Sequence, residues 1–406
     1  MKIGIFLEGS PNMGGGFFQS LKSSLLLLDI KKFESNFELI ITQQKTKSYL
    51  KKKKIKNNLF RLNKFSKYFS QLFEIDYFRD FFNKIKLNHP FYNFIKKNEY
   101  DIVIFLGPSL MSKYCKEVAF ISNIWDLDHK KNSQFPEHNF NNVYEQKEKL
   151  FKEIVSRAFK IVVPHKSNKK DLINFYKADE TKIITQNFIP MLPTIFIENK
   201  YNKDFYKNLF INFNLPKDKI IIFYPAQFWA HKNHKYIIDA AEILKKQNDT
   251  KYLFVFCGGD KGNFRYIKSL ITEKKLDDII KIFNFVSDDE IISLYINSNG
   301  VVMPTYCGPT NLPIYESFYF KKIIFYTKDL IPDDIINDHL IKIDISSPLD
   351  FCKQLEIYSD SSKIEKITRE NYKYYNLVCD ENLFKKNYEN TLTEFLYLLN
   401  RWKLNK

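Results

Sequence analysis

The sequence predicts an α/β protein of two domains, each built on a parallel sheet, and three observations lead to this fold class. The chain has 406 residues, which exceeds what one hydrophobic core usually serves, so two domains of about 200 residues are expected. Short apolar runs alternate with helical patterns along both halves, which is typical of parallel sheets. Loops rich in glycine, proline or polar side chains follow these runs, at the sheet edge where such folds bind ligands.

A buried strand and a glycine loop open the first half. The strand is predicted over residues 2–8, and a helix is predicted over residues 17–28, after the triplet Gly14, Gly15 and Gly16. Glycine lets backbone N–H groups approach a phosphate or sugar at a helix N-terminus. The spacing matches neither the GxGxxG fingerprint nor a Walker loop. Further strands of this half are predicted at residues 37–42, 102–106, 117–124 and 160–164.

The strand that ends near Ile124 is followed by a polar cluster at the carboxyl edge of the sheet. Its candidates for chemistry are Asp126, Asp128 and His129. One interpretation is an Asp-x-Asp metal site that holds a diphosphate, and the other is a polar cluster without metal. Hard cations usually recruit further oxygen ligands, and the sequence identifies none, so both interpretations stay open at this point.

The second half repeats the pattern after residues 187–206, which carry two prolines, lack periodicity and are interpreted as an interdomain linker. Lys232 precedes a helix predicted over residues 236–246, where a cation can add to the backbone donors that hold a diphosphate. A solvated surface lysine is the alternative. Strands are predicted at residues 219–224, 252–257 and 280–285. The second is followed by the loop from Gly258 to Gly262, which contains Lys261, and the third ends at Val286.

The last predicted strand of this half, residues 301–303, is followed by a loop in which prolines and Gly308 prevent regular structure. A helix then restarts over residues 314–320 and carries one carboxylate, Glu316, in its first turn. By itself this is an ordinary strand-to-helix connection. With Lys232, the Gly258 loop and Val286 at neighbouring strand ends, the four loops are expected to line one crevice.

Charge is unevenly distributed. The net charge is +16, and residues 45–97 contain fifteen Lys or Arg against three acids, together with thirteen Phe or Tyr. Leu62, Phe65, Phe69, Leu72 and Phe73 fall at helical spacing in this segment. A basic, aromatic-rich helix suits an anionic membrane surface, while aromatic residues in the core and solvated lysines are the alternative interpretation. No RRM, zinc-finger or helix-turn-helix pattern supports binding to nucleic acid.

Cysteine usage and hydropathy indicate a cytoplasmic protein. The five cysteines are odd in number, widely spaced and form no CxxC motif, which argues against a disulfide framework or a structural zinc site. The N-terminus lacks the apolar core of a signal peptide, and no stretch approaches the ~20 apolar residues of a membrane span. Any membrane contact is therefore expected to be peripheral.

The order of these motifs resembles the GT-B glycosyltransferases, in particular glycosyltransferase family 4. The segments that carry the resemblance are the GGG after the first strand, IWDLDHKKNSQFPE, IVVPHKSNKKDL, YPAQFWAHKNH, FCGGDKG, FNFVSDDEIISLY and PTYCGPTNLPIYES. The resemblance implies two Rossmann-like domains facing across a cleft, with the last helix crossing back to the first domain. The expected limits are residues 1–195 for the acceptor domain, 196–385 for the nucleotide-sugar donor domain and 386–406 for the crossing helix.

The resemblance also implies roles for residues of the second half. Glu316 matches the glutamate that hydrogen-bonds the ribose of the donor, and Lys232 matches the diphosphate lysine. Gly308 stands where a second glutamate is usual, so Asn311 and the backbone amides of Thr310 to Leu312 are candidates for the donor-sugar contact. Gln227 stands where an arginine is usual, and Lys261 or Gly14 to Gly16 are expected to compensate. Gly258 and Val286 are expected to contact the base through their backbone.

The implied activity is a retaining transfer of a hexosyl group from a nucleotide-diphosphate sugar, GDP-mannose or a UDP-hexose, with no cofactor and no required metal. Asp126 and His129 would orient the acceptor or the donor sugar, although Trp125 replaces the histidine common in relatives. A saccharide or lipid-linked acceptor in bacterial surface polysaccharide or lipopolysaccharide synthesis is expected, at the inner face of the cytoplasmic membrane. A catalytically impaired binding or scaffold subunit, suggested by Gly308 and Gln227, and an Asp-x-Asp metal-dependent transferase remain alternatives.

Overall fold

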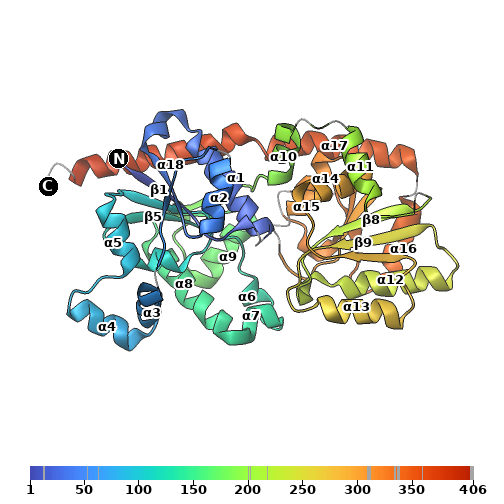
Figure 1. Cartoon of the computed structure of the whole chain (residues 1–406), viewed down its shortest axis with the longest axis horizontal. Coiled ribbons are helices and arrows are strands. Elements are labelled where there is room, and N and C mark those ends of the chain that lie inside the picture. The colour runs from blue at the N-terminus through green and yellow to red at the C-terminus, as the bar shows by residue number, and fades with distance from the viewer. Residues whose placement is uncertain are drawn as a thin grey trace. The chain divides into compact units, whose positions relative to one another are not determined.

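The computed structural model describes residues 1–11, 14–52, 54–62, 64–199, 201, 203–216, 218–308, 312–332, 335, 339–358 and 360–402. The chain divides into two compact units (Figure 1). Unit 1 contains Met1–Leu127, Glu145–Ile189 and Asp380–Lys406. Unit 2 contains Asp128–Tyr144 and Pro190–Cys379. A short segment of the first half of the sequence, residues 128–144, therefore packs with the second half.

Unit 1 is built on a parallel sheet of seven strands in the order β3-β2-β1-β4-β5-β6-β7. Its strands are β1 (Ile3–Leu7), β2 (Phe37–Ile41), β3 (Asn57–Leu59), β4 (Ile102–Phe105), β5 (Ala119–Asn123), β6 (Lys160–Val163) and β7 (Ile183–Thr185). Strands β1 and β4 lie side by side although they are far apart in sequence, so the strand order reverses between them. Such a switch point is where open α/β sheets bind ligands.

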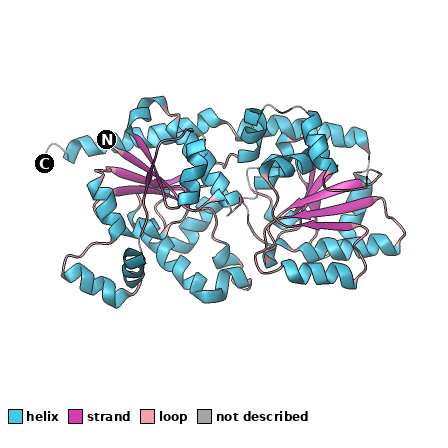
Figure 2. Cartoon of the chain, in the orientation of Figure 1, coloured by secondary structure: helices cyan, strands magenta, loops and turns pink. Residues whose placement is uncertain are grey.

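Helices cover both faces of the unit 1 sheet (Figure 2). They are α1 (Gly15–Leu28), α2 (Gln44–Lys52), α3 (Lys64–Leu72), α4 (Asp76–Lys84), α5 (Pro90–Lys97), α8 (Val143–Arg157), α9 (Lys166–Tyr176) and α18 (Glu381–Trp402), with 3-10 turns η2 (Lys31–Asn36), η3 (Leu110–Tyr114) and η5 (Glu180–Lys182). The parallel sheet and its helices confirm the α/β class predicted from the alternating pattern.

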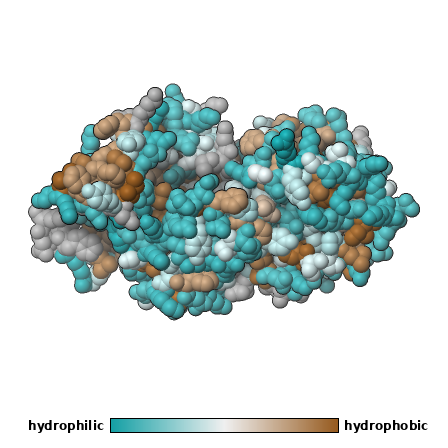
Figure 3. Space-filling model, turned by 90° about the horizontal axis from the view of Figure 1, so that it is seen from below, coloured by the Kyte–Doolittle hydropathy of each residue, from teal (hydrophilic) through white to brown (hydrophobic). Residues whose placement is uncertain are grey.

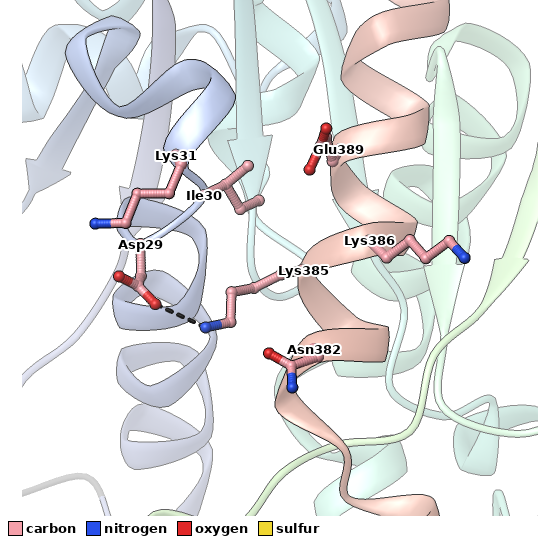
Figure 4. A pocket seen from close by; sticks show the side chains of 7 residues that line it. All are labelled: Asp29, Ile30, Lys31, Asn382, Lys385, Lys386 and Glu389. Atoms are coloured by element: carbon pink, nitrogen blue, oxygen red, sulfur yellow. Dashed lines mark hydrogen bonds and ion pairs between the residues drawn. The ribbon is translucent and has the colours of Figure 1, made fainter.

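The C-terminal helix α18 returns to unit 1, as the resemblance implied. It contacts α1, and the Nζ of Lys22 lies 2.5 Å from a carboxylate oxygen of Glu381. Figure 4 shows side chains that line a pocket between residues 29–31 and α18, where Lys385 reaches back to Asp29 at 2.7 Å. Tyr388 on the same helix is buried and donates a hydrogen bond to Asn123 at the end of β5.

The basic, aromatic-rich segment of residues 45–97 contributes both to the core and to the surface of unit 1. Phe73 and Phe82 are buried in the main hydrophobic cluster, and Leu62, Phe69 and Leu72 pack against it. Other large side chains of this segment are exposed, namely Phe65, Tyr68, Ile75, Tyr77, Phe78, Phe81, Ile85 and Leu87. The core interpretation therefore holds for some of the aromatic residues, whereas the predicted membrane contact of the exposed ones stays a prediction.

Unit 2 is built on a parallel sheet of six strands in the order β10-β9-β8-β11-β12-β13. The strands are β8 (Ile220–Pro225), β9 (Tyr252–Cys257), β10 (Ile280–Phe283), β11 (Gly300–Met303), β12 (Ile323–Thr327) and β13 (Ile341–Ile343). The strand order reverses between β8 and β11, so the loops that follow these two strands flank the switch point of this sheet.

The helices of unit 2 also lie on both faces of its sheet (Figure 2). They are α6 (Asp128–Lys131), α7 (Pro136–Asn139), α10 (Met191–Asn199), α11 (Lys203–Ile211), α12 (His234–Lys246), α13 (Phe264–Glu273), α14 (Asp288–Asn297), α15 (Leu312–Tyr319), α16 (Pro348–Ile357) and α17 (Ser361–Val378), with 3-10 turns η4 (Phe140–Asn142), η6 (Ala230–Lys232) and η7 (Lys328–Leu330).

One sequence prediction in this region is wrong. The chain passes from unit 1 to unit 2 within residues 187–206, after Ile189, but the segment is not irregular, because α10 forms from Met191 to Asn199. Pro193 is tolerated there because it lies in the first turn, where its missing N–H has no intrahelical acceptor to lose. Met191, Leu192 and Ile195 are buried, and the helix contacts α14 and α15. Tertiary packing therefore makes a helix of a segment whose apolar residues show little periodicity.

Candidate functional site

The loops that follow β8 and β11 are joined at the switch point of unit 2. The backbone N–H of Tyr306 donates to the carbonyl of His231 at 2.8 Å, and the Thr305 hydroxyl donates to the same carbonyl at 3.3 Å. Lys232 ends the 3-10 turn η6, and its carbonyl accepts a hydrogen bond from the buried hydroxyl of Tyr224. Asn233 then takes a left-handed conformation with φ 54° before α12 begins. These bonds fix the backbone that carries Lys232.

The loop after β9 lies directly against the loop after β8. The backbone N–H of Phe228 donates to the carbonyl of Gly259 at 3.0 Å. A Cβ added to Gly258 would lie 2.2 Å from the carbonyl oxygen of Ala226, so only glycine permits this approach. The Nζ of Lys261 lies 5.6 Å from the centre of the Trp229 ring, within the range of a cation–π contact. Lys261 therefore lies close to the loop that carries Lys232.

Gln227 takes part in orienting Trp229. Its side-chain oxygen accepts a hydrogen bond from the indole N–H of Trp229 at 3.0 Å. The residue that stands in the place of an expected arginine thus holds an aromatic side chain rather than a charge. The positive charge of this loop comes from Lys232 and, across the neighbouring loop, from Lys261.

Glu316 lies in α15, which begins at Leu312 close to the end of β11. It is 8% exposed, and the hydroxyl of Tyr295 donates to its Oε2 at 2.7 Å. Burial raises the pKa of Glu316 to about 7, against the lowering effect of the Tyr295 hydrogen bond. A carboxyl group in this state titrates near neutral pH, and hydrogen-bond donors from a ligand would favour its ionised form.

The remaining predicted residues of unit 2 lie at the same edge of the sheet or outside the described residues. Val286 follows the end of β10, immediately before Ser287, which caps α14 in a capping box with Glu290. Gly308 has a φ of 94°, in the left-handed region that favours glycine. Thr310 and Asn311 lie outside the residues that the structure describes, so the proposed donor-sugar contact of Asn311 stays a prediction.

Residues 128–144, here called the strap, contact the loops after β8 and β11. Glu137, whose side chain is 7% exposed, accepts hydrogen bonds from the His231 backbone N–H at 3.1 Å and from the His231 ring. Burial alone would raise the pKa of Glu137, but the His231 side chain and backbone amides lower it to about 2. The strap thus places a carboxylate against the residue that precedes Lys232.

Further contacts hold the strap to the loop after β11. The ring of Phe135 lies 5.4 Å from the ring of Tyr306, centre to centre. Nε2 of the buried His138 lies 3.7 Å from the sulfur of Cys307. The strap therefore covers both loops that flank the switch point of unit 2.

In unit 1, the glycine loop after β1 fits the side chain of Trp125. A Cβ added to Gly16 or to Gly107 would lie 3.0 or 2.9 Å from the Trp125 ring. The indole N–H donates to the carbonyl of Leu106 at 3.1 Å. Gly14 has a φ of 82°, and a Cβ added to Gly15 would meet no atom within 4 Å. A side chain at Gly15 would thus enter open space, whereas Gly16 makes room for the indole.

The Asp-x-Asp pair is divided between the two units. Asp126 is half-buried at the end of the first part of unit 1, whereas Asp128 begins α6 in unit 2 and is buried. His129 is also buried, with its ring 5.6 Å from that of Tyr144. Among the described residues, no three His, Cys, Asp or Glu side chains come together in a group that could hold a metal ion.

A comparison with family models identifies the second half of the chain. Residues 206–375 match the family described as glycosyl transferases group 1, and this segment contains all four strand ends of the candidate site. Residues 206–375, here called the group 1 domain, are therefore similar to this family of glycosyl transferases. A search of curated protein sequences gave no significant match.

The whole chain has the GT-B fold of solved glycosyltransferases. A glycosyltransferase from Rickettsia africae aligns with a TM-score of 0.71 at 18% identity, over 97% of this chain and 99% of that one. The Anabaena protein HepE, solved with UDP-glucose, aligns with a TM-score of 0.72 at 13% identity, over 97% and 100% of the two chains. Sucrose-phosphate synthase from Thermosynechococcus elongatus aligns at 0.70 and 12% identity, over 98% and 100%. At these identities the likeness concerns the fold.

Sequence reasoning missed three contacts of the strap: the Glu137–His231 pair, the His138–Cys307 contact and the packing of Phe135 on Tyr306. Each joins residues more than 90 positions apart, so no local spacing could have indicated it. The segments that contain them, IWDLDHKKNSQFPE and YPAQFWAHKNH, were recognisable as motifs. Their partnership was not, because it depends on the strap packing with the other half of the chain.

Proposed function

We propose that the protein is a retaining hexosyltransferase that uses a nucleotide-diphosphate sugar. The observation that supports the proposal is that the loops after β8, β9 and β11 meet at the carboxyl edge of the unit 2 sheet, with Lys232 in the first, Gly258 to Gly262 in the second and Glu316 in the helix after the third. Lys232, Lys261 and backbone N–H groups suit a diphosphate, and the buried carboxyl of Glu316 suits the ribose hydroxyls. Gln227, Gly258, Val286, Gly308 and Leu312 complete the proposed donor site, with Thr310 and Asn311 at its sugar end.

The proposed reaction is a displacement on one face of the sugar. The bond from the anomeric carbon to the diphosphate oxygen breaks, and its electron pair leaves with the diphosphate. An acceptor hydroxyl oxygen then bonds to the same face of the anomeric carbon, and its proton passes to the diphosphate oxygen that has left. Lys232 and backbone amides stabilise the charge that develops on the diphosphate. Asp126 and His129 are proposed to orient the acceptor or the donor sugar, and Gly14 to Gly16 to assist in binding the diphosphate.

The donor is proposed to be a UDP-hexose or GDP-mannose. The Anabaena protein HepE was solved with UDP and glucose and with UDP-glucose, which supports testing uridine nucleotides first. A thermal-shift panel of nucleotide diphosphates and sugar nucleotides is the direct test, because a ligand at about a hundred times its dissociation constant adds about 2.7 kcal/mol to the free energy of unfolding. Stabilisation by none of them would contradict the proposed donor site.

The acceptor is proposed to be a saccharide or lipid-linked saccharide used in bacterial surface polysaccharide or lipopolysaccharide synthesis. No described helix is both long and apolar enough to cross a membrane. The basic segment of residues 45–97, with its exposed aromatic side chains, supports a cytoplasmic enzyme that contacts the anionic inner face of the membrane peripherally. The test is an assay with a radiolabelled sugar nucleotide. Label is expected to appear on a lipid-linked saccharide when one is added, and no hydrolysis of the donor is expected without an acceptor.

A binding or scaffold subunit without turnover is the second candidate. The observation that favours it is Gln227, a neutral residue that accepts from the Trp229 indole and brings no second charge to this position. Both candidates predict that a nucleotide stabilises unit 2. They differ in an assay of sugar transfer with and without EDTA: the proposed enzyme transfers equally in both, a scaffold subunit transfers in neither, and a metal-dependent enzyme loses activity with EDTA.

A further inference from the structure

Trp229 joins the loop after β8 to the loop after β9, and the proposed reaction gives it no role. Its indole N–H donates to the side-chain oxygen of Gln227 at 3.0 Å, and its carbonyl accepts from the backbone N–H of Lys232 at 3.2 Å. The Nζ of Lys261 lies 5.6 Å from the centre of its ring. Trp229 therefore contacts both of the lysines that the donor site is proposed to use.

The backbone brings Trp229 and Lys261 together as well. Phe228 and Asp260 form a parallel β-bridge, and the carbonyl of Phe228 accepts from the backbone N–H of Asn263 at 3.1 Å. Trp229 and Lys261 are the residues that follow the two bridge partners. Because paired positions of parallel strands project their side chains to the same side, the register of the bridge favours the contact between the indole and the lysine.

Asp260 also fixes the turn that carries Lys261. Its Oδ1 accepts from the backbone N–H of Gly262 at 2.8 Å and from that of Phe264 at 3.3 Å. Gly262 has a φ of 100°, in the left-handed region that favours glycine. The backbone of Lys261 is therefore held on both sides, and only its side chain remains to be placed.

The ring contact restricts the side chain of Lys261. Lys261 is exposed, and a long exposed side chain loses rotamer freedom when it binds a ligand. A contact with an aromatic face reduces that freedom before the ligand arrives. The ring face is no conventional hydrogen-bond acceptor, so the contact leaves the N–H donors of the ammonium group for the oxygens of an anion.

We propose that Trp229 is a positioning residue of the donor site, whose ring holds the Lys261 ammonium group beside the turn that carries Lys232. Two cations from neighbouring loops then bind one nucleoside diphosphate, and Gln227 orients the indole between them. The inference rests on the proposed donor site and deepens it, because it explains how the site obtains a second cation although Gln227 is neutral. A purely structural role, in which the indole fills the space between the loops, is the alternative that the test must exclude.

The test measures the affinity of the full chain for UDP and for GDP by calorimetric titration, which requires no acceptor. Lys261→Gln removes the second cation and is expected to lower the affinity about tenfold. Trp229→Leu removes the ring and is expected to lower it about two- to fivefold. Trp229→Phe keeps an aromatic face without the indole N–H and should stay within about twofold of the wild type. A Phe variant as weak as the Leu variant would overturn the role of the ring face.

A double substitution separates positioning from a structural role. If Trp229 acts through Lys261, the variant Trp229→Leu/Lys261→Gln should bind as Lys261→Gln does, because the ring has no cation left to hold. Multiplied losses in the double variant would overturn the proposal, since they would show that the indole acts independently. Thermal unfolding without nucleotide should be the same in all these variants and the wild type, and a Trp229→Leu transition lowered in parallel with its affinity would assign the indole to structure alone.

Salt provides an electrostatic measurement of the same site. Salt screens charges in contact with solvent, so the affinity of the wild type should fall more steeply with ionic strength than that of Lys261→Gln. Equal salt dependence would show that the Lys261 charge does not meet the diphosphate. Lys268→Gln is the matched control, because it removes an exposed lysine of α13 in the same unit. Figure 3 shows mostly hydrophilic surface over the part of unit 2 where Figure 1 places α13.

The control variant should keep the affinity and the salt dependence of the wild type, and losses equal to those of Lys261→Gln would overturn the proposal by indicating diffuse attraction. Failure of the inference differs from failure of the proposed function. A wild-type protein that binds neither UDP nor GDP would refute the donor site itself and the inference with it. Wild-type binding that Lys261→Gln and Trp229→Leu leave unchanged would refute only the role of these two residues.

Discussion

Lys232 is the residue on which the proposed charge stabilisation depends. Replacing Lys232 by Ala should reduce sugar transfer at least about 100-fold if its ammonium group supplies about 3 kcal/mol to the transition state. Its backbone is held by Tyr224 and by the Trp229 carbonyl, so the loop is expected to keep its shape. The measurement is kcat/KM with a saturating acceptor.

Lys235→Ala is the matched control for this substitution. Lys235 lies three residues further along, is exposed on α12 and pairs with Asp239 one turn away. A surface pair of this kind contributes less than about 1 kcal/mol, so transfer should remain near the wild-type rate. Similar rates for the two variants would show that Lys232 is an ordinary surface lysine.

Glu316 should make stability and donor affinity depend on pH. Its folded-state pKa is about 7, raised by burial above the usual 4.5. The protonated form therefore stabilises the fold fully below pH 4.5, and this contribution is lost as the pH rises to 7. A shift of this size corresponds to about 3 kcal/mol of unfolding free energy. In Glu316→Gln this loss of unfolding free energy with rising pH should be absent. Urea unfolding of both proteins at pH 4.5 to 8 measures it.

Donor affinity should follow the opposite trend. Ribose hydroxyls donate to the ionised carboxylate, so nucleotide binding by the wild type should strengthen as the pH rises toward 7 and then level off. In Glu316→Gln, calorimetric titration should give a weaker affinity with little pH dependence. Tyr295→Phe removes the hydrogen bond that lowers this pKa, so its midpoint should move upward. A Gln variant with the wild-type pH profile would assign the titration to another group.

At the scale of elements, the strap is expected to determine the position of the loop after β8. Glu137→Gln removes the charge that accepts from both the backbone and the ring of His231. Hydrogen bonds to charged groups contribute about 1.5–3 kcal/mol, so unit 2 should lose stability of this order at pH 7. Nucleotide affinity should fall several-fold because Lys232 follows His231 directly. Thermal unfolding with and without nucleotide measures both effects.

Glu273→Gln is the control for the strap, because it removes an exposed carboxylate from α13 of the same unit. It should change neither stability nor affinity. The pKa of Glu137, lowered to about 2, adds a pH signature: its stabilisation is present above pH 4.5 and is lost as the pH falls toward 2. Equal behaviour of the two variants would show that the strap does not position the loop.

Helices and strands were easier to predict from the sequence than the contacts between them. The strand over residues 252–257, the helix that contains Glu316 and the helix that follows Lys232 lie where apolar runs, prolines and glycines predicted them, because these signals act over a few residues. Helix α10 was missed because its stability comes from burial against α14. The Glu137–His231 contact was missed for a related reason: it joins residues from distant parts of the chain, and only the folded structure brings them together.

At the scale of the whole molecule, each unit has its own sheet and core although neither is continuous in sequence. The core face of α18 belongs to unit 1, and its Leu392 is 0% exposed. Leu392→Ala should therefore destabilise unit 1 by about 2–5 kcal/mol, although residue 392 follows the donor half in sequence. Calorimetry should show one unfolding transition lowered and the nucleotide-stabilised transition unchanged.

The matched control is the same substitution in the core of unit 2, and it should lower the other unfolding transition. Leu294 is equally buried in α14 of unit 2, so Leu294→Ala removes the same atoms from the other core. It should lower the transition that nucleotide raises and leave the other in place. If each substitution lowered both transitions equally, the two units would unfold as one cooperative body, and nucleotide would then stabilise unit 1 as much as unit 2. Selective effects would instead place the donor-dependent stability in the group 1 domain alone.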